Sequence, residues 1–202
     1  QLAEQTEGSV TLISMGPSGN LQGIRQALAM GADKAVVIDD GALRGSDSLA
    51  TAGVLAAAIK REGFDLVIAG TESTDGYAGI LPQQLAELLE VPALTFAKKV
   101  TVEGDKVKIE RQTESGYDEV EAPAPALVSV TAGVVEPRYP TFKGIMQAKS
   151  KPVDTVTAGD LGADVASQQK IVGIRPAPER AAGEVVEDDG ESHLKIVELL
   201  EQ

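Results

Sequence analysis

The sequence predicts an α/β fold in which a mostly parallel sheet is flanked by helices. Short apolar runs of four or five residues alternate with segments whose apolar residues recur at helical spacing, as expected for strands alternating with helices. Apolar and polar residues alternate on both sides of Gly104, which indicates an antiparallel hairpin in the same domain. The C-terminal part is irregular and acidic, and we expect it to form an extended arm.

The first half of the chain contains three predicted strands. They are the apolar runs 10–14 (VTLIS), 35–38 (AVVI) and 66–69 (LVIA). A helix with Leu21, Ile24 and Leu28 on one face follows the first strand. Ser18 is its expected N-cap, and Gly31 is expected to end it.

Two further helices follow the second and third strands. Ser46 is the expected N-cap of the first, and Gly63 is expected to end it. The apolar face of this helix contains Ala52, Leu55, Ala56 and Ile59. The second helix carries Leu81, Leu85, Leu88 and Leu89 on one face. Pro82 is compatible only with its first turn.

The middle of the chain changes character. Val100 and Val102 alternate with polar residues, residues 103–105 form a turn, and Val107 and Ile109 alternate again. This pattern predicts two antiparallel strands joined by a hairpin turn.

A final core strand is predicted at 126–130 (ALVSV), with Pro123 and Pro125 at its entry. From Asp154 onward we expect irregular structure and one short terminal helix that contains Leu194 to Leu200. The predicted division is a nucleotide-binding α/β domain at 1–153 and a C-terminal arm at 154–202.

The composition excludes several kinds of site. The 202 residues include no cysteine, which excludes disulfides and cysteine-ligated metal centres. His193 is the only histidine, and we interpret it as an exposed residue without a catalytic partner. The formal net charge of −13 lacks the basic footprint of a nucleic-acid binder. No apolar run approaches the ~20 residues that span a bilayer, so we expect neither a nucleic-acid partner nor membrane insertion.

The segment 70–79 (GTESTDGYAG) is the first candidate ligand site. It follows a predicted strand and precedes a helix, which is where open parallel sheets bind ligands. Glycines allow close approach of the backbone, amides at a helix start attract phosphates, and Ser73 and Thr74 add hydroxyl donors. Neither a Walker motif nor a dinucleotide fingerprint is present. An ordinary flexible turn is the alternative, and the same choice applies to Met15-Gly16-Pro17 after the first strand.

The second candidate site is a basic and apolar segment flanked by prolines, 137–152. Its basic residues are Arg138, Lys143, Lys149 and Lys151, and its large apolar residues are Tyr139, Phe142, Ile145 and Met146. Such a segment suits docking onto an acidic partner, because unlike potentials speed encounter. A helix with an apolar core face and a solvated lysine face is the alternative.

Four stretches of the chain resemble the beta subunit of electron-transfer flavoproteins. They are 14–17 (SMGP), 27–34 (ALAMGADK), 70–76 (GTESTDG) and 137–146 (PRYPTFKGIM). The last of these is quite specific to the family, and the resemblance runs in order over nearly the whole chain. Residues 160–162 and the acidic tail also fit.

The resemblance implies a fold like that of the adenine nucleotide alpha hydrolases and a larger alpha subunit that holds most of a redox FAD. It implies a buried AMP of mainly structural role in this subunit. The heterodimer would accept electrons from acyl-CoA or related dehydrogenases, as in fatty acid oxidation. The chain would then be an electron-carrier subunit rather than an enzyme, in the cytoplasm of a bacterium or in the mitochondrial matrix of a eukaryote. The C-terminal arm would pack on the alpha subunit.

Carried over residue by residue, the resemblance assigns two sites. The nucleotide site would contain Met15, Gly70, Asp75, Gly76, Tyr77, Ala78, Gly79 and Gln83. Phe142 would be the apolar anchor of a docking loop at 136–152, with Lys143, Ile145 and Met146 beside it. The family's first strand, which also supplies nucleotide contacts, would precede Gln1.

Three alternatives stay open at this point. In electron-bifurcating relatives a second FAD takes the place of AMP, and residues 75–79 match neither pattern fully. A stand-alone nucleotide-binding enzyme of the same fold group, such as an ATP pyrophosphatase or ligase, is the second. A stress-type nucleotide-sensing module that forms a homodimer is the third.

Overall fold

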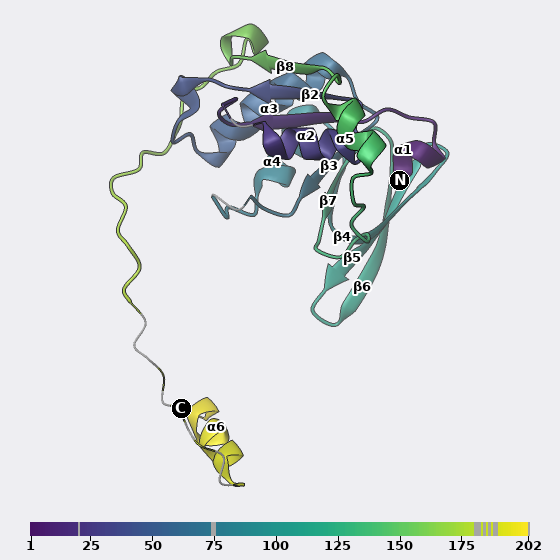
Figure 1. The fold of residues 1–202 in the computed structure, drawn as a ribbon. Coiled ribbons are helices and arrows are strands. Elements are labelled where there is room, and N and C mark those ends of the chain that lie inside the picture. The colour runs from purple at the N-terminus through teal and green to yellow at the C-terminus, as the bar shows by residue number, and fades with distance from the viewer. Residues whose placement is uncertain are drawn as a thin grey trace. The chain divides into compact units, whose positions relative to one another are not determined.

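The structure, a computed structural model, describes residues 1–19, 21–73, 76–179, 183, 185, 187 and 190–201. The chain divides into two units, Gln1–Lys170 and Ile171–Gln202. The first unit contains the strands and the helices that cover them (Figure 1). The second unit contains one described helix, α6.

The described strands form two sheets, with the orders β1-β2-β8 and β3-β7-β4-β5-β6. The strands are β1 Thr11–Met15, β2 Lys34–Ile38, β3 Leu66–Gly70, β4 Ala93–Glu103, β5 Lys106–Thr113, β6 Gly116–Pro123, β7 Ala126–Val130 and β8 Val153–Val156. Strands β1, β2 and β8 are parallel, as are β3, β7 and β4, whereas β4, β5 and β6 form an antiparallel meander. The predicted α/β class is confirmed, and the hairpin gains a third strand, β6, that the sequence analysis did not predict.

The helices are α1 Leu2–Gln5, α2 Gln22–Ala29, α3 Ser48–Glu62, α4 Leu81–Leu89, α5 Phe142–Ala148 and α6 Ser192–Leu200, with the 3-10 turns η1 Gly41–Leu43 and η2 Gly159–Leu161. Helices α2, α3, α4 and α6 lie where the sequence predicted helices, whereas α1 was not predicted and a helix at α5 was only an alternative. Pro82 stands in the first turn of α4, as expected. Gly63 ends α3 with a positive φ of 73°, which a residue without Cβ adopts without strain.

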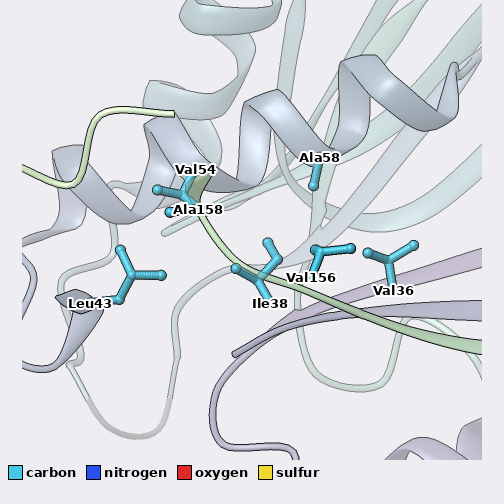
Figure 2. Packing of buried hydrophobic residues seen from close by; sticks show 7 residues of the cluster. All are labelled: Val36, Ile38, Leu43, Val54, Ala58, Val156 and Ala158. Atoms are coloured by element: carbon cyan, nitrogen blue, oxygen red, sulfur yellow. The ribbon is translucent and has the colours of Figure 1, made fainter. Parts of the chain in front are cut away.

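Successive residues of β2 pack on opposite faces of the first sheet. Val36 and Ile38 belong to a core cluster beneath α3, and Figure 2 shows the side chains of helix and strands pointing toward one another. Ala35 packs on the other face with Leu28 of α2 and Ala148 of α5. Helices therefore cover both faces of this sheet, as the sequence predicted.

The second sheet is built around β7. Leu127 packs in a cluster with Leu85 of α4 and residues of α3, so helices cover this face. Ala126 and Val128 pack on the opposite face, in a cluster with Ile109 of the meander. Apolar side chains of the strands themselves cover that second face.

Two predicted helix caps are wrong: a neighbouring side chain caps α3, and α2 has no side-chain cap. The Asp47 carboxylate, not Ser46, accepts the amide of Ala50 at 2.8 Å and caps α3. Ser18 does not cap α2, because its hydroxyl donates to Asp39. Helix α2 begins without a side-chain cap.

The chain that follows α5 is more regular than predicted. Strand β8 pairs with β2, and Leu161 in η2 packs against the cluster beneath α3. The Asp47 carboxylate accepts the amides of Gln168 and Gln169 at 2.6 and 3.0 Å, which fixes the end of the first unit. The irregular structure expected from Asp154 is therefore wrong for β8 and η2. Four residues, two of them polar, carry too little alternation to indicate a strand.

Candidate functional site

Two loops that follow parallel strands lie at the same end of the first unit. Strand β1 is parallel to β2, and α3 returns the chain from the end of β2 to the start of β3. The carboxyl ends of these strands therefore lie on one side, which is the left side in Figure 1. Strands β1 and β3 belong to different sheets, but Ile13 of β1 and Leu55 of α3 pack against the clusters of both. Open α/β sheets bind ligands at this edge.

The loop after β1 is held against β2. The amide of Gly16 donates to the carbonyl of Ile38 at 3.0 Å. The hydroxyl and the amide of Ser18 donate to the Asp39 carboxylate at 2.6 and 2.8 Å. These bonds, the hydroxyl first, hold the pKa of Asp39 below its ordinary value. Met15 lies at the predicted edge, with its side chain packed against the cluster beneath α3.

Replacing Asp39 with Asn is expected to flatten the acid limb of the stability curve. Folding lowers the pKa of Asp39 from the ordinary 3.8. The carboxylate therefore stabilises the folded state fully above that value and loses this effect as the pH falls through the lowered pKa. In urea unfolding between about pH 5 and pH 3, the wild-type free energy of unfolding should fall more steeply than that of Asp39→Asn. Asp118→Asn, at an exposed carboxylate on β6, is the control. Equal slopes for wild type and Asp39→Asn would show that the Ser18 bonds do not stabilise the loop.

Hydrogen bonds hold the described residues of the loop between β3 and α4. The amide of Tyr77 donates to the carbonyl of Ser73 at 3.1 Å. Tyr77 and Gly79 have left-handed backbones, with φ of 48° and 65°. This conformation is uncommon for an aromatic residue and costs about 1–3 kcal/mol. The hydroxyl of Thr71 donates to the carbonyl of Val130 at 3.0 Å and ties the loop to β7.

Most of the predicted nucleotide-site residues lie together on this loop and the adjoining helix start. They are Gly70, Gly76, Tyr77, Ala78, Gly79 and Gln83. Asp75 lies outside the described residues. Met15 is the last residue of β1 and lies on a separate strand.

The first turn of α4 offers hydrogen-bonding groups to a ligand. Its N-cap residue, Ile80, makes no side-chain cap. The side-chain oxygens of Gln83 and Gln84 are buried, and neither has a hydrogen-bond partner within the described part of the chain. Leaving a buried acceptor unsatisfied costs about 1–3 kcal/mol. Free amides at a helix start attract an anion, so this turn suits a ligand that combines an anionic group with N–H or O–H donors.

A cleft of about 560 Å³ opens beside this loop, at the carboxyl ends of β3 and β7. Its lining residues are Thr71, Glu72, Gln112, Val130, Thr131 and Ala132. Sequence reasoning missed Gln112 and Thr131, because only the folded sheet brings β5 and the end of β7 to this place. The position of Thr131, directly after a predicted core strand, was the one available signal.

A bulge in β4 lies next to this cleft. The pairing of β4 with β7 shifts register between Leu94 and Ala97, and Phe96 has a left-handed φ of 58°. The amide of Phe96 donates to the hydroxyl of Ser129, which is 1% exposed, at 3.0 Å. Thr131 at the cleft wall donates from its amide to the carbonyl of Ala97 at 3.0 Å. The bond from Thr131 thus connects the β4 bulge to the wall of the cleft. The single serine in ALVSV was the only feature of the sequence that could have indicated this bulge.

The predicted docking residues lie on α5, where their apolar side chains are exposed. Phe142 is 82% exposed, Ile145 46% and Met146 50%, whereas Ala148 is the buried residue of this helix. The alternative of an apolar core face is therefore wrong, since the residues that would form it do not enter the core of this chain. We call the exposed group Phe142, Lys143, Ile145 and Met146 the α5 surface.

Two of the four basic residues in this segment make internal bonds. The guanidinium of Arg138 donates to both carboxylate oxygens of Glu4, at 2.7 and 2.8 Å, and lowers the pKa of Glu4 to about 2. Lys151 donates to backbone carbonyls near the end of α2. Lys143 and Lys149 are exposed and carry the positive charge close to the α5 surface.

The part of the chain that the structure describes contains no group of three or more acidic or histidine side chains that would hold a metal ion. The same residues include no helix with the length and apolarity to cross a bilayer. His193 is exposed on α6.

The chain is similar in sequence to known proteins over most of its length. The family model of the electron transfer flavoprotein domain matches residues 1–161. The chain is 43% identical to the electron transfer flavoprotein subunit beta of Mycobacterium tuberculosis (strain H37Rv) over 207 residues, which cover 99% of this chain and 78% of the relative. The proteins of the same name from Megasphaera elsdenii and Mus musculus are 39% identical over 200 residues and 38% identical over 192 residues. These two alignments cover 92% and 94% of this chain, and 74% and 75% of the relatives.

Proposed function

The chain belongs to the electron transfer flavoprotein family as a beta subunit, and from this premise we propose that it forms a heterodimer with a larger alpha subunit. In this proposal the heterodimer accepts electrons from acyl-CoA or related dehydrogenases through an FAD held mainly by the alpha subunit, and this chain carries no catalytic residue. The observation that carries the proposal is the α5 surface, where three large apolar side chains are exposed on a helix that packs against α2 within the first unit.

The α5 surface suits a partner that binds briefly. Phe142 is the most exposed of its apolar side chains and would act as the anchor. Lys143 and Lys149 would attract an acidic partner at long range, although the chain as a whole carries a net charge of −13. A small apolar anchor with a charged surround gives fast association and fast release, which an electron carrier requires between its donor and its acceptor.

The loop after β3 and the start of α4 would hold AMP. Gly76, Gly79 and the first turn of α4 would take the phosphate, and the buried oxygen of Gln83 would accept a hydrogen bond from an N–H or O–H of the nucleotide. AMP supplies no redox chemistry. It would stabilise the folded subunit because it binds the folded state and not the unfolded chain.

Replacing Gln83 with Met is expected to weaken AMP retention by about tenfold, because a ligand donor would lose its acceptor. The variant keeps a side chain of similar length on the same helix. AMP released from the purified heterodimer after dialysis is the measurement, with Gln26→Met on the exposed side of α2 as the matched control. Wild-type retention in Gln83→Met would remove Gln83 from the site.

The C-terminal unit would pack on the alpha subunit. Helix α6 exposes its large apolar side chains, Leu194, Ile196, Val197, Leu199 and Leu200. Exposed apolar surface of this kind marks a protein interface. The arm would therefore bury these residues against its partner.

Co-expression with an alpha subunit tests the proposed function directly. The purified complex should be yellow and should accept electrons from a reduced acyl-CoA dehydrogenase, whereas this chain purified alone should hold little flavin. A stable homodimer that does not combine with the alpha subunit would contradict the proposal, as would tightly bound flavin on the isolated chain.

A further inference from the structure

Helix α5 is too short to be stable without support. It has seven residues, and Ala148 is the residue that it buries. Isolated helices below about 12–15 residues are marginal in water. The presentation of the α5 surface therefore depends on the contacts that fix this helix to the rest of the first unit.

Basic side chains of α2 and of the chain after α5 bind carbonyls at or just beyond the C-terminal end of the other helix. Arg25 of α2 donates from Nη1 to the carbonyls of Ala148 and Lys151, at 2.7 and 2.8 Å. Lys151 donates in return from Nζ to the carbonyls of Leu28 and Ala32, at 3.0 and 2.6 Å. Carbonyls at a helix end lack intrahelical donors and carry partial negative charge, so cations stabilise them.

Gly144 allows the two helices to touch. A Cβ at this position would overlap the carbonyl oxygen of Ala29 at the end of α2. The amide of Gly144 donates to the hydroxyl of Thr141 at 3.0 Å, which caps α5. Leu28 and Ala148 belong to one buried cluster between the helices and the sheet. The side of α5 that carries Gly144 and Ala148 thus faces α2, and the remaining side presents the α5 surface.

We propose that Arg25, Gly144 and Lys151 are positioning residues for partner docking. This inference rests on the proposed docking function of the α5 surface. By fixing α5 before the partner arrives, the three residues let Phe142 and Ile145 bind as ordered groups. If the helix had to become ordered during binding, the lost conformational entropy would weaken the complex.

The variant Gly144→Ala in the complete heterodimer tests this role. Gly23→Ala is the matched control, because it makes the same change on α2 where a Cβ meets nothing within 4 Å. Hydrogen exchange of the α5 amides reports whether the helix is fixed, and titration with an acyl-CoA dehydrogenase reports the dissociation constant. We expect faster exchange in α5 and binding weaker by about tenfold in Gly144→Ala, with unchanged flavin content. Gly23→Ala should behave as wild type.

Arg25→Met provides a second variant that removes two hydrogen bonds without a steric clash, and it decides the question if Gly144→Ala does not assemble. Arg25→Lys, which keeps one cationic donor, should recover part of the lost affinity. A mobile α5 with wild-type affinity would overturn the positioning role, and so would unchanged exchange in these variants. Phe142→Ala distinguishes a failure of the positioning role from a failure of the docking function. If Phe142→Ala binds the dehydrogenase with wild-type affinity, the docking function of the α5 surface itself is wrong.

Discussion

Replacing Phe142 with Ala is expected to lower kcat/KM for electron acceptance from a dehydrogenase by about 30-fold or more, the effect of losing an interface residue worth about 2 kcal/mol. Phe142 is 82% exposed in this chain and begins α5, so it can enter a pocket on a partner without rearrangement of the core. The flavin and AMP content of the heterodimer should not change. The measurement is steady-state reduction of a terminal dye, with the heterodimer as the varied substrate.

Two further variants serve as controls for this experiment. Tyr117→Ala removes another exposed aromatic side chain, on β6, and should leave kcat/KM unchanged. Phe142→Leu keeps an apolar anchor and should recover much of the rate. If Phe142→Ala transferred electrons as fast as Tyr117→Ala, the α5 surface would not be the docking site.

Replacing Ile196 with Asp on α6 is expected to weaken assembly with the alpha subunit by about 100-fold or more, because an unpaired charge would be buried at the interface. Ile196, Val197 and Leu200 lie on one side of α6 by helical spacing, and all three are exposed in this chain. Analytical ultracentrifugation of the two purified subunits over a range of concentrations measures the dissociation constant.

Glu198→Lys is the matched control for this variant. Positions 196 and 198 do not share a side of a helix, so a changed charge at Glu198 should have a small effect on assembly. Wild-type assembly of Ile196→Asp would show that this side of α6 stays outside the subunit interface.

The strands that the sequence predicted correctly share a local signal. β1, β2, β3 and β7 are short apolar runs that end at a glycine or a polar turn, a composition typical of strands in a parallel sheet. Pro82 and Gly63 likewise mark a helix start and a helix end through their own backbone preferences. Such features need no knowledge of distant residues.

The features that the sequence did not reveal depend on contacts between distant segments. Nothing near Lys151 indicates that its ammonium will bind carbonyls of α2, more than one hundred positions earlier. The cleft wall at Gln112 requires the meander to lie beside β7. Asp47 was missed as a cap because Ser46, its neighbour, has the same capping chemistry, and the fold decides between them.

In the segment 137–152, too, the local sequence pattern and the fold determine different features. Its basic and apolar composition allowed either a core-facing helix or a docking surface. The structure excludes the core-facing helix, because Gly144 and Ala148 occupy the side that faces α2 and Phe142, Ile145 and Met146 are exposed. The docking role of these exposed residues stays a prediction. Local pattern could identify the helix, but not the side of it that the first unit would bury.

Quantification of the nucleotides released by denaturing the purified heterodimer is the most direct test of this account. If this subunit binds an adenine nucleotide at the end of β3 while the redox flavin belongs mainly to its partner, chromatography should detect FAD and AMP in equal amounts. Two FAD molecules per heterodimer without AMP, or FAD with no second nucleotide, would contradict it.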